Sequence, residues 1–235
     1  FQYKVQFIKP TKSDIIHQLK EGWHIFVSNI VTSVYTTSNI FILGFFASNT
    51  VVGYYSSAEK IVKAVASAIS PLTQTFYPFL SKALQESRER TISILSKIFF
   101  FITVGMGIMS LLIGVNAKLL VNVALGPNYE ATIPLLQILS VLPLILGWAS
   151  VFGILTMINL NYKKELSRIY IIASVFSIIL MFTLIPTYKE YGTAWNAILT
   201  EAFATLLMAI FLRKKGIILW RWTDISSLWK MRVKN

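Results

Sequence analysis

Six long apolar stretches divide the chain and predict six membrane-spanning helices. A bilayer core of about 30 Å needs about 20 mostly apolar residues, each rising about 1.5 Å along a helix. Every stretch is long enough, and only 14% of all residues are charged. We therefore expect an all-α membrane protein with one six-helix bundle at residues 23–213. The expected spans are 23–46, 55–80, 98–117, 131–158, 168–187 and 191–212.

Basic residues alternate between the connections of these spans. Of 22 lysines and arginines, eighteen fall in the lead-in, in the connections after the second and fourth spans, and in the tail. The connections on the other side carry only Lys118 and Lys189. Because an excess of Lys and Arg marks the cytoplasmic side, both ends of this segment are predicted to be cytoplasmic.

The two ends of the segment are predicted to lie along the cytoplasmic membrane interface. Residues 1–22 form a lead-in, for which an amphipathic helix that turns inward at Gly22 is expected. Residues 214–235 form a tail in which tryptophans alternate with basic residues, as in interfacial anchors. The net charge of +12 is spread over loops, which favours membrane lipid over nucleic acid as the partner. Since the chain starts at Phe1, a fragment is expected.

Polar side chains form stripes on the first two spans. In the first span Ser28, Thr32, Tyr35 and Asn39 share a helix face. The stripe of the second span comprises Ser56, Lys60, Lys63, Ser67, Ser70, Gln74, Tyr77 and Ser81. Polar groups that face acyl chains are costly, so these faces should meet protein or water. The hydroxyls alone could simply join packed helices, whereas the stripe with two lysines favours a hydrated cavity.

Three ionisable residues cluster in the second span. Glu59 and Lys63 are four residues apart, in the favourable order for an ion pair. Lys60 then leaves one positive charge on the same face, which could hold a phosphate. The alternative is that both lysines reach outward to the membrane interface.

Glu201 is predicted to lie about 15 Å into the last span, near the middle of the bilayer. A carboxyl group there could exchange a proton or bind an ion, so Glu201, with Glu59 as a second candidate, is predicted to couple transport to an ion. The alternative is a structural glutamate bonded to Asn196, Thr205 or a neighbouring helix.

Prolines predict bends in two of the spans, since proline removes a backbone donor. Pro71 and Pro78 should kink the second span, and the fourth is expected to tilt or break near Pro134.

The sequence gives no sign of catalysis. It has no cysteine, no glycine-rich phosphate loop and only two histidines, His17 and His24. We therefore expect no enzyme activity, no catalytic residue, no metal site and no cofactor.

Three runs of sequence resemble a known transporter family. They are EGWHIFVSNIVTSVYTTSNIFILGFF at 21–46, VGYYSSAEKIVKAVASAISPLTQTFYPFLSK at 52–82 and LGPNYEATIPLLQILSVLPLILGWASVFG at 125–153. They resemble bacterial O-antigen flippases, the polysaccharide-transporter branch of the multidrug/oligosaccharidyl-lipid/polysaccharide exporter superfamily. The resemblance implies twelve spans in two six-helix lobes, of which this chain is the carboxy-terminal lobe, with a missing amino-terminal lobe as its partner.

The same resemblance implies a function in the bacterial inner membrane. It is the ion-coupled, alternating-access movement of undecaprenyl-pyrophosphate-linked oligosaccharide to the periplasmic leaflet, with a polysaccharide polymerase and a chain-length regulator as further partners. Lys60 and Lys63 would then meet the pyrophosphate. The predicted partners of the sugar hydroxyls are Tyr35, Asn39, Ser67, Ser70 and Gln74.

Two other functions stay open at this point. One is a multidrug cation antiporter of the same superfamily, which should favour acidic and aromatic residues over lysines. The other is a membrane-bound enzyme of glycan assembly such as a polymerase, which should have a large periplasmic loop.

Overall fold

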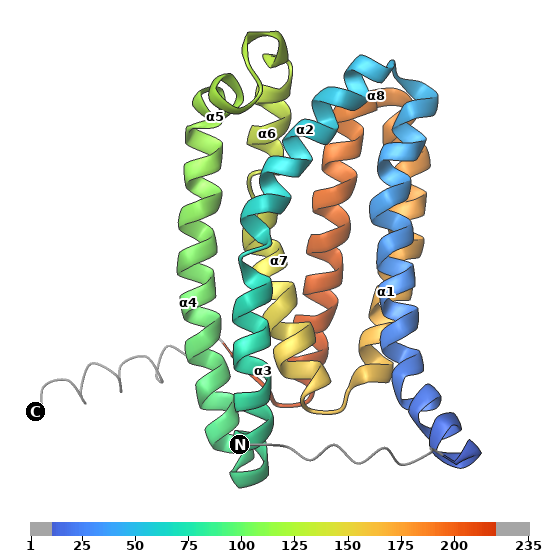
Figure 1. Cartoon of the computed structure of the whole chain (residues 1–235), viewed down its shortest axis with the longest axis vertical. Helices are drawn as coiled ribbons and strands as arrows, with labels where there is room; N and C mark the ends of the chain where they lie inside the picture. The colour runs from blue at the N-terminus through green and yellow to red at the C-terminus, as the bar shows by residue number, and fades with distance from the viewer. Residues whose placement is uncertain (1–10, 220–235) are drawn as a thin grey trace, which may run out of the picture.

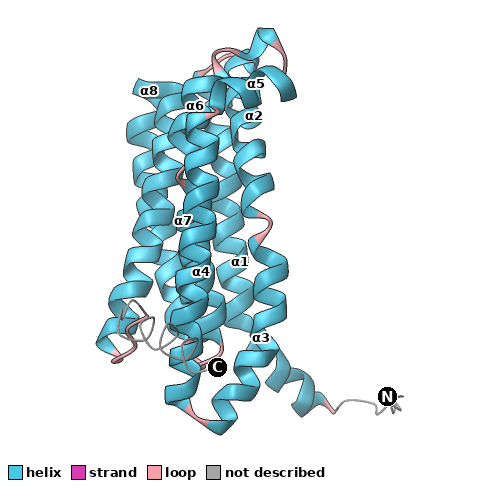
Figure 2. Cartoon of the chain, turned by 90° about the vertical axis from the view of Figure 1, so that its left-hand side faces the viewer, coloured by secondary structure: helices cyan, strands magenta, loops and turns pink. Residues whose placement is uncertain are grey.

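The computed structural model describes residues 11–219, and helices running lengthwise side by side form a bundle there (Figure 1). Within that range the structure contains helices and connections but no strand (Figure 2). This confirms the predicted all-α class. The helices are α1 (Lys12–Phe46), α2 (Asn49–Ala66), α3 (Ile69–Glu86), α4 (Arg88–Val115), α5 (Ala117–Ala124), η1 (Pro127–Tyr129), α6 (Thr132–Leu139), α7 (Leu142–Ser150), the π-helix η2 (Val151–Ile158) and α8 (Lys163–Lys214).

Helix α8 crosses the bundle twice. Its 52 residues would extend about 78 Å if straight, but the backbone reverses at Lys189, where φ is 48° and ψ is −121°. Ring contacts confirm that the two halves run antiparallel. The ring centroids of Tyr162 and Phe211 are 5.2 Å apart, and those of Phe176 and Phe203 are 4.4 Å apart. The reversal falls between the predicted fifth and sixth spans.

The reversal in α8 is so tight that it requires a glycine. A Cβ atom on Gly192 would lie 2.4 Å from the carbonyl oxygen of Leu184, a distance at which backbone atoms would have to move.

The second crossing consists of α2 and α3, which follow one another with a break at Ser67 and Ala68 (Figure 1). Pro71 has no N–H with which to bond the Ser67 carbonyl, and the backbone N–H of Ser70 donates to that carbonyl instead, at 3.1 Å. The bend predicted at Pro71 is thereby confirmed. Pro78 remains inside α3.

Helix α1 runs through Gly22 as one continuous helix from Lys12 to Phe46, and its first turns tilt away from the bundle (Figure 1). One local prediction is wrong. The fourth crossing does not break near Pro134, which lies in the first turn of α6, where a missing N–H costs little. The interruption comes at Ser140 and Val141, directly before α7.

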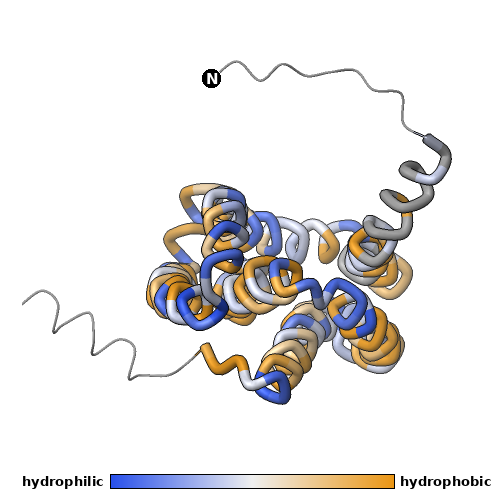
Figure 3. The backbone as a smooth tube through the Cα atoms, turned by 90° about the horizontal axis from the view of Figure 1, so that it is seen from below, coloured by the Kyte–Doolittle hydropathy of each residue, from blue (hydrophilic) through white to orange (hydrophobic). Residues whose placement is uncertain are grey.

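The charge pattern of the sequence corresponds to the two ends of the bundle. One end holds the α3–α4 turn, the start and finish of α8 and the start of α1, and the other holds α5, η1 and the reversal of α8 (Figure 1). Seen from the first end, hydrophilic residues gather at the tips of the helices (Figure 3). Basic residues at this end include Lys82, Arg88, Arg90, Lys163, Lys164, Arg213 and Lys214.

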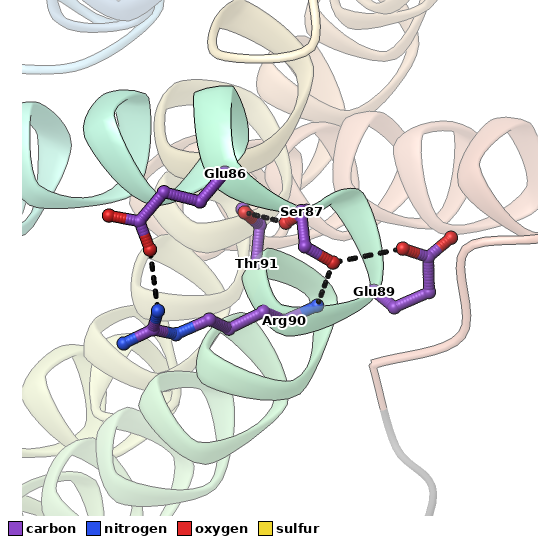
Figure 4. Close-up of polar contacts among 5 residues, drawn as sticks. All are labelled: Glu86, Ser87, Glu89, Arg90 and Thr91. Atoms are coloured by element: carbon purple, nitrogen blue, oxygen red, sulfur yellow. Dashed lines mark hydrogen bonds and ion pairs between the residues drawn. The ribbon is translucent and has the colours of Figure 1, made fainter.

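The α3–α4 turn at the basic end is fixed by Ser87 (Figure 4). Its hydroxyl accepts a hydrogen bond from the backbone N–H of Arg90 at 3.3 Å and donates to the Glu89 carboxylate at 3.0 Å. The Thr91 hydroxyl donates to the Ser87 carbonyl at 2.9 Å. Ser87 therefore acts as the N-cap of α4 and satisfies a backbone donor that the helix cannot.

The bundle is a multi-pass membrane protein. In the described part of the chain, four helical segments are long and apolar enough to cross a membrane: Ile25–Phe46, Arg88–Val115, Thr132–Ile158 and Lys163–Lys214. Large apolar side chains such as Phe101, Leu111 and Phe182 are exposed on the outside, as expected where acyl chains are the solvent.

Candidate functional site

The polar residues of the second crossing lie on an open face. Lys60, Lys63, Ser67, Ser70 and Gln74 are all exposed, and we call these five residues the α2–α3 stripe. The opposite face of the same two helices is buried, with Tyr55, Ala58, Val62 and Leu80 completely enclosed. The stripe is thus the side of α2–α3 that the other described helices leave uncovered.

The predicted ion pair between Glu59 and Lys63 is confirmed. The Lys63 Nζ atom lies 3.0 Å from the Glu59 Oε1 atom, and the Glu59 side chain is 10% exposed while that of Lys63 is 54% exposed. Lys60 is exposed, and no carboxylate in the described part of the chain lies within ion-pair distance of it. The cluster of three therefore carries one net positive charge on the open face.

The uncharged side chains of the stripe bond along their own helices. The Ser67 hydroxyl donates to the Ala64 carbonyl at 2.6 Å, and the Gln74 side-chain amide donates to the Ser70 hydroxyl at 3.0 Å. These bonds hold the side chains close to the helix surface. Acceptor positions on the same oxygen atoms and the second N–H of Gln74 can still bond a ligand.

Asn39 lies apart from the stripe, in the packed interface between α1 and α8. It is 3% exposed, and its Oδ1 atom accepts a hydrogen bond from the Asn196 side-chain amide at 2.5 Å. The Oδ1 atom of Asn196 accepts a hydrogen bond from the Thr200 hydroxyl at 3.2 Å, and the Nδ2 atom of Asn196 donates to the Ser177 hydroxyl at 3.3 Å. We call Asn39, Ser177, Asn196 and Thr200 the Asn196 cluster. It joins α1 to both halves of α8 and matches the helix-joining alternative that the sequence leaves open.

The other predicted partner of the sugar, Tyr35, is part of α1, but its side chain falls outside the part of the structure that can be described. The structure thus brings the stripe residues together with Glu59 and places Asn39 elsewhere.

Glu201 borders a small, partly open cavity of about 120 Å³. The cavity lies among α1, α7, η2 and both halves of α8, and its polar lining comes from Thr32, Ser150, Tyr170 and Glu201. Along α8, Glu201 follows Ile198 of one apolar core cluster and precedes Ala204 of the other. The predicted position within the membrane-spanning region is consistent with this placement.

Several polar residues of these two sites are not among the predicted ones. Ser177, Thr200, Ser150 and Tyr170 lie in apolar stretches where isolated hydroxyls attract little notice. The sequence does contain a pattern that indicates Ser177: Ser167, Ser174 and Ser177 recur at helical spacing, and the structure buries all three.

A larger cavity of about 630 Å³ is almost wholly apolar. It lies among α4, α7 and the second half of α8, and its walls include Phe99, Leu144, Trp148 and Leu206. Such walls suit hydrocarbon and cannot satisfy a sugar or a phosphate. No three histidine, aspartate or glutamate side chains come close enough to hold a metal ion within residues 11–219.

Comparison with known proteins supports the resemblance. The family model for polysaccharide biosynthesis proteins matches residues 1–84. A protein of Escherichia coli K12 named "Putative O-antigen transporter" is 34% identical over 205 residues, which cover 87% of this chain and 49% of that protein. One of the same name from Shigella dysenteriae is 29% identical over 197 residues, or 83% of this chain and 48% of that protein. No solved structure matches.

The chain spans about half the length of these two relatives. Its predicted resemblance to polysaccharide transporters of the O-antigen type is confirmed.

Proposed function

We propose that this chain forms one lobe of a transporter for lipid-linked O-antigen or a similar surface polysaccharide, and that the α2–α3 stripe lines the transport path. The substrate is an undecaprenyl-pyrophosphate-linked oligosaccharide, which the complete protein moves across the bacterial inner membrane to the periplasmic leaflet. The names of both relatives and the matching family model support this class of substrate.

The observation that carries the proposal is the exposure of the stripe. From Lys60 to Gln74 the polar face extends about 21 Å along the helix direction, and every stripe residue on it is exposed. A face of this kind would be costly against acyl chains, so water or a second lobe must cover it. The relatives have room for such a lobe, because the match with this chain covers only about half of each.

The charge of the stripe suits an anionic substrate. Lys60 and Lys63 can both donate to a pyrophosphate, and the pairing of Lys63 with Glu59 limits the net charge to one, so that the substrate can also leave. The hydroxyl and amide groups of Ser67, Ser70 and Gln74 have the donors and acceptors that sugar hydroxyls require. A cavity for cationic drugs would need the opposite charge.

Ion coupling is assigned to Glu201. Its carboxyl group borders a cavity between α1 and α8, so binding or release of a proton or a sodium ion there would change how these two helices pack. The salt bridge of Glu59 with Lys63 makes Glu59 the weaker candidate. The Glu201→Gln variant should abolish the dependence of transport on pH or sodium, and an unchanged dependence would exclude this role.

Complementation of a flippase-deficient strain tests the proposal. In the strain that carries the full-length protein with Lys60→Ala plus Lys63→Ala, surface O-antigen should be lower than with wild type by about tenfold or more. The reason is that charge-assisted bonds to the pyrophosphate are lost.

The matched control is Lys118→Ala plus Lys189→Ala, which removes the same charge from exposed positions at the end of the bundle opposite the basic end. It should complement like wild type at equal protein levels. Undiminished O-antigen in the stripe variant would refute the assignment of the site. If the variant changed the susceptibility to cationic drugs and left O-antigen unchanged, the antiporter would be favoured.

A further inference from the structure

A cleft with the lining of a carbohydrate site opens at the end of the bundle opposite the basic end. Its volume is about 540 Å³, within the range of small-molecule sites. The lining is uncharged and consists of amide, hydroxyl and aromatic groups together with one glycine: Asn49, Thr50, Gly53, Tyr54, Asn128 and Tyr129.

Two separate parts of the chain build this cleft. Asn49, Thr50, Gly53 and Tyr54 belong to the first two turns of α2, whereas Asn128 and Tyr129 belong to η1. Gly126, with φ of 87°, turns the backbone directly before η1. The rings of Tyr54 and Tyr129 then meet at 84° with their centroids 5.8 Å apart, and this contact fixes η1 against α2.

Gly53 lies in the wall of the cleft and leaves room there for a ligand. A glycine inside a helix costs about 0.5–1 kcal/mol relative to alanine, and close packing commonly explains why one is present. A Cβ atom on Gly53 would meet nothing within 4 Å, so packing does not explain it. Its missing side chain leaves the floor of the cleft open.

The polar groups of the cleft are available to a ligand. Within the described part of the chain, the side chains of Asn49, Thr50 and Asn128 make no hydrogen bond with other residues, and neither do the two tyrosine hydroxyls. Asparagine amides offer both donors and acceptors. Together with tyrosine rings they match a sugar ring, which has hydroxyls around its edge and C–H groups on its faces.

The cleft also continues the α2–α3 stripe. Gly53 and Lys60 are seven residues apart, as are Lys60 and Ser67, so all three lie on one face of the helix. The rise from Lys60 to Gly53 is about 10 Å, roughly the reach of two linked sugar rings.

We infer that this cleft binds sugar rings of the lipid-linked oligosaccharide while Lys60 and Lys63 hold its pyrophosphate. The inference rests on the proposed function and adds to it a second binding site on the same substrate. The cleft has no cationic side chain for a phosphate, and its amides and hydroxyls are unsuited to a hydrocarbon tail.

Binding to two probes separates the two sites. The full-length protein in lipid nanodiscs is titrated with undecaprenyl pyrophosphate, which has no sugar, and with the lipid-linked repeat unit extracted from a transporter-deficient source strain. Wild type should bind the glycosylated lipid at least about tenfold more tightly, as expected from one or two additional hydrogen bonds with sugar.

Variants of the cleft should remove this preference and leave the affinity for the bare lipid unchanged. Gly53→Leu fills the cleft, and Asn128→Ala plus Tyr129→Ala removes its far wall. Lys60→Ala plus Lys63→Ala should weaken the binding of both lipids by the same factor and keep the preference.

Two controls address folding and helix propensity. Gly53→Ala adds one carbon in open space and should keep the preference. Gly105→Leu makes the same exchange as Gly53→Leu at a glycine of α4 that is also free of contacts within 4 Å, and it should bind both lipids like wild type.

The outcomes distinguish the two proposals. If wild type binds neither lipid, the proposed function fails and the cleft assignment fails with it. If wild type binds both lipids equally, or if Gly53→Leu and the wall variant retain the preference, the cleft assignment alone is wrong.

Discussion

The polar residues of α1 and those of α2–α3 have the same helical spacing in the sequence, yet the structure uses them in opposite ways. Asn39 on α1 is buried and bonded to Asn196 of α8, whereas Lys60, Ser70 and Gln74 on α2–α3 are exposed. The first set joins helices within the bundle, and the second is open to a partner or a ligand. Helical spacing therefore identifies a polar face but does not say what covers it.

The difference between the two regions has consequences for stability. Removal of a bonded group from a buried cluster leaves its partners unsatisfied, which costs about 1–3 kcal/mol. Removal of an exposed polar group usually changes the free energy of unfolding by less than about 0.5 kcal/mol. Substitutions on the α1–α8 side should thus affect folding, and those on the stripe should affect transport.

The largest effect is expected for Gly192→Ala in the reversal of α8. The added Cβ atom would lie 2.4 Å from the Leu184 carbonyl oxygen, so we expect a loss of about 3 kcal/mol or more in stability. Thermal unfolding of the purified full-length protein in detergent measures this loss. Gly53→Ala is the matched exchange in open space, and it should raise stability by about 0.5–1 kcal/mol. Similar melting temperatures for both variants would contradict the tight reversal.

The next largest effect is expected for Asn196→Ala. The side chains of Asn39, Ser177 and Thr200 would lose their shared partner, and stability should fall by about 2 kcal/mol.

A double-mutant cycle with Asn39→Ala provides the check on this cluster, because the two losses should not add if the residues bond one another. Fully additive losses would show that the Asn39–Asn196 bond contributes nothing.

A smaller loss of stability is expected for Lys63→Ala, and it should exceed that of Lys60→Ala. Loss of Lys63 leaves the nearly buried Glu59 carboxylate without its partner, at a cost of about 1 kcal/mol, between the values of surface and buried ion pairs. Loss of the exposed Lys60 should leave the melting temperature unchanged. Both variants should lower transport, and equal melting temperatures would show that the Glu59–Lys63 pair adds no stability.

A similarly small effect on stability is expected for Ser70→Ala plus Gln74→Ala. Both side chains are exposed and bond each other. The free energy of unfolding should therefore change by no more than about 0.5 kcal/mol, which thermal unfolding measures as a small shift in melting temperature. Surface O-antigen in the complementation assay should nevertheless fall. Normal transport at wild-type protein levels would remove these two residues from the proposed path.

Much of the bundle could be predicted from the sequence because bilayer physics acts on local patterns. Length and hydropathy predict the six crossings, the alternation of basic residues predicts the two ends, and a spacing of four residues predicts the Glu59–Lys63 pair. A proline predicts the break between α2 and α3 at Pro71, since a missing N–H is a local property. The same reasoning fails at Pro134, because a proline in the first turn of a helix loses no bond.

The site could be predicted only in part. The lysines and hydroxyls of the stripe share a face by sequence periodicity alone. The assignment of Asn39 to the sugar overlooked a partner 157 residues away, and a contact of that separation leaves no mark on local spacing. Tyr129 likewise gives no sign in the sequence that it would pack against Tyr54.

The sequence by itself determined the all-α membrane class, the charged ends and the polar face of α2–α3, because each depends on neighbours within a few helical turns. Only the tertiary structure decided which polar face is covered, since α8 folds back at Lys189 and packs against α1 while no described helix covers the stripe face of α2–α3. The structure also decided that η1 reaches α2 to form the cleft at Gly53. Both decisions depend on the packing of segments far apart in the chain, which residue spacing does not encode.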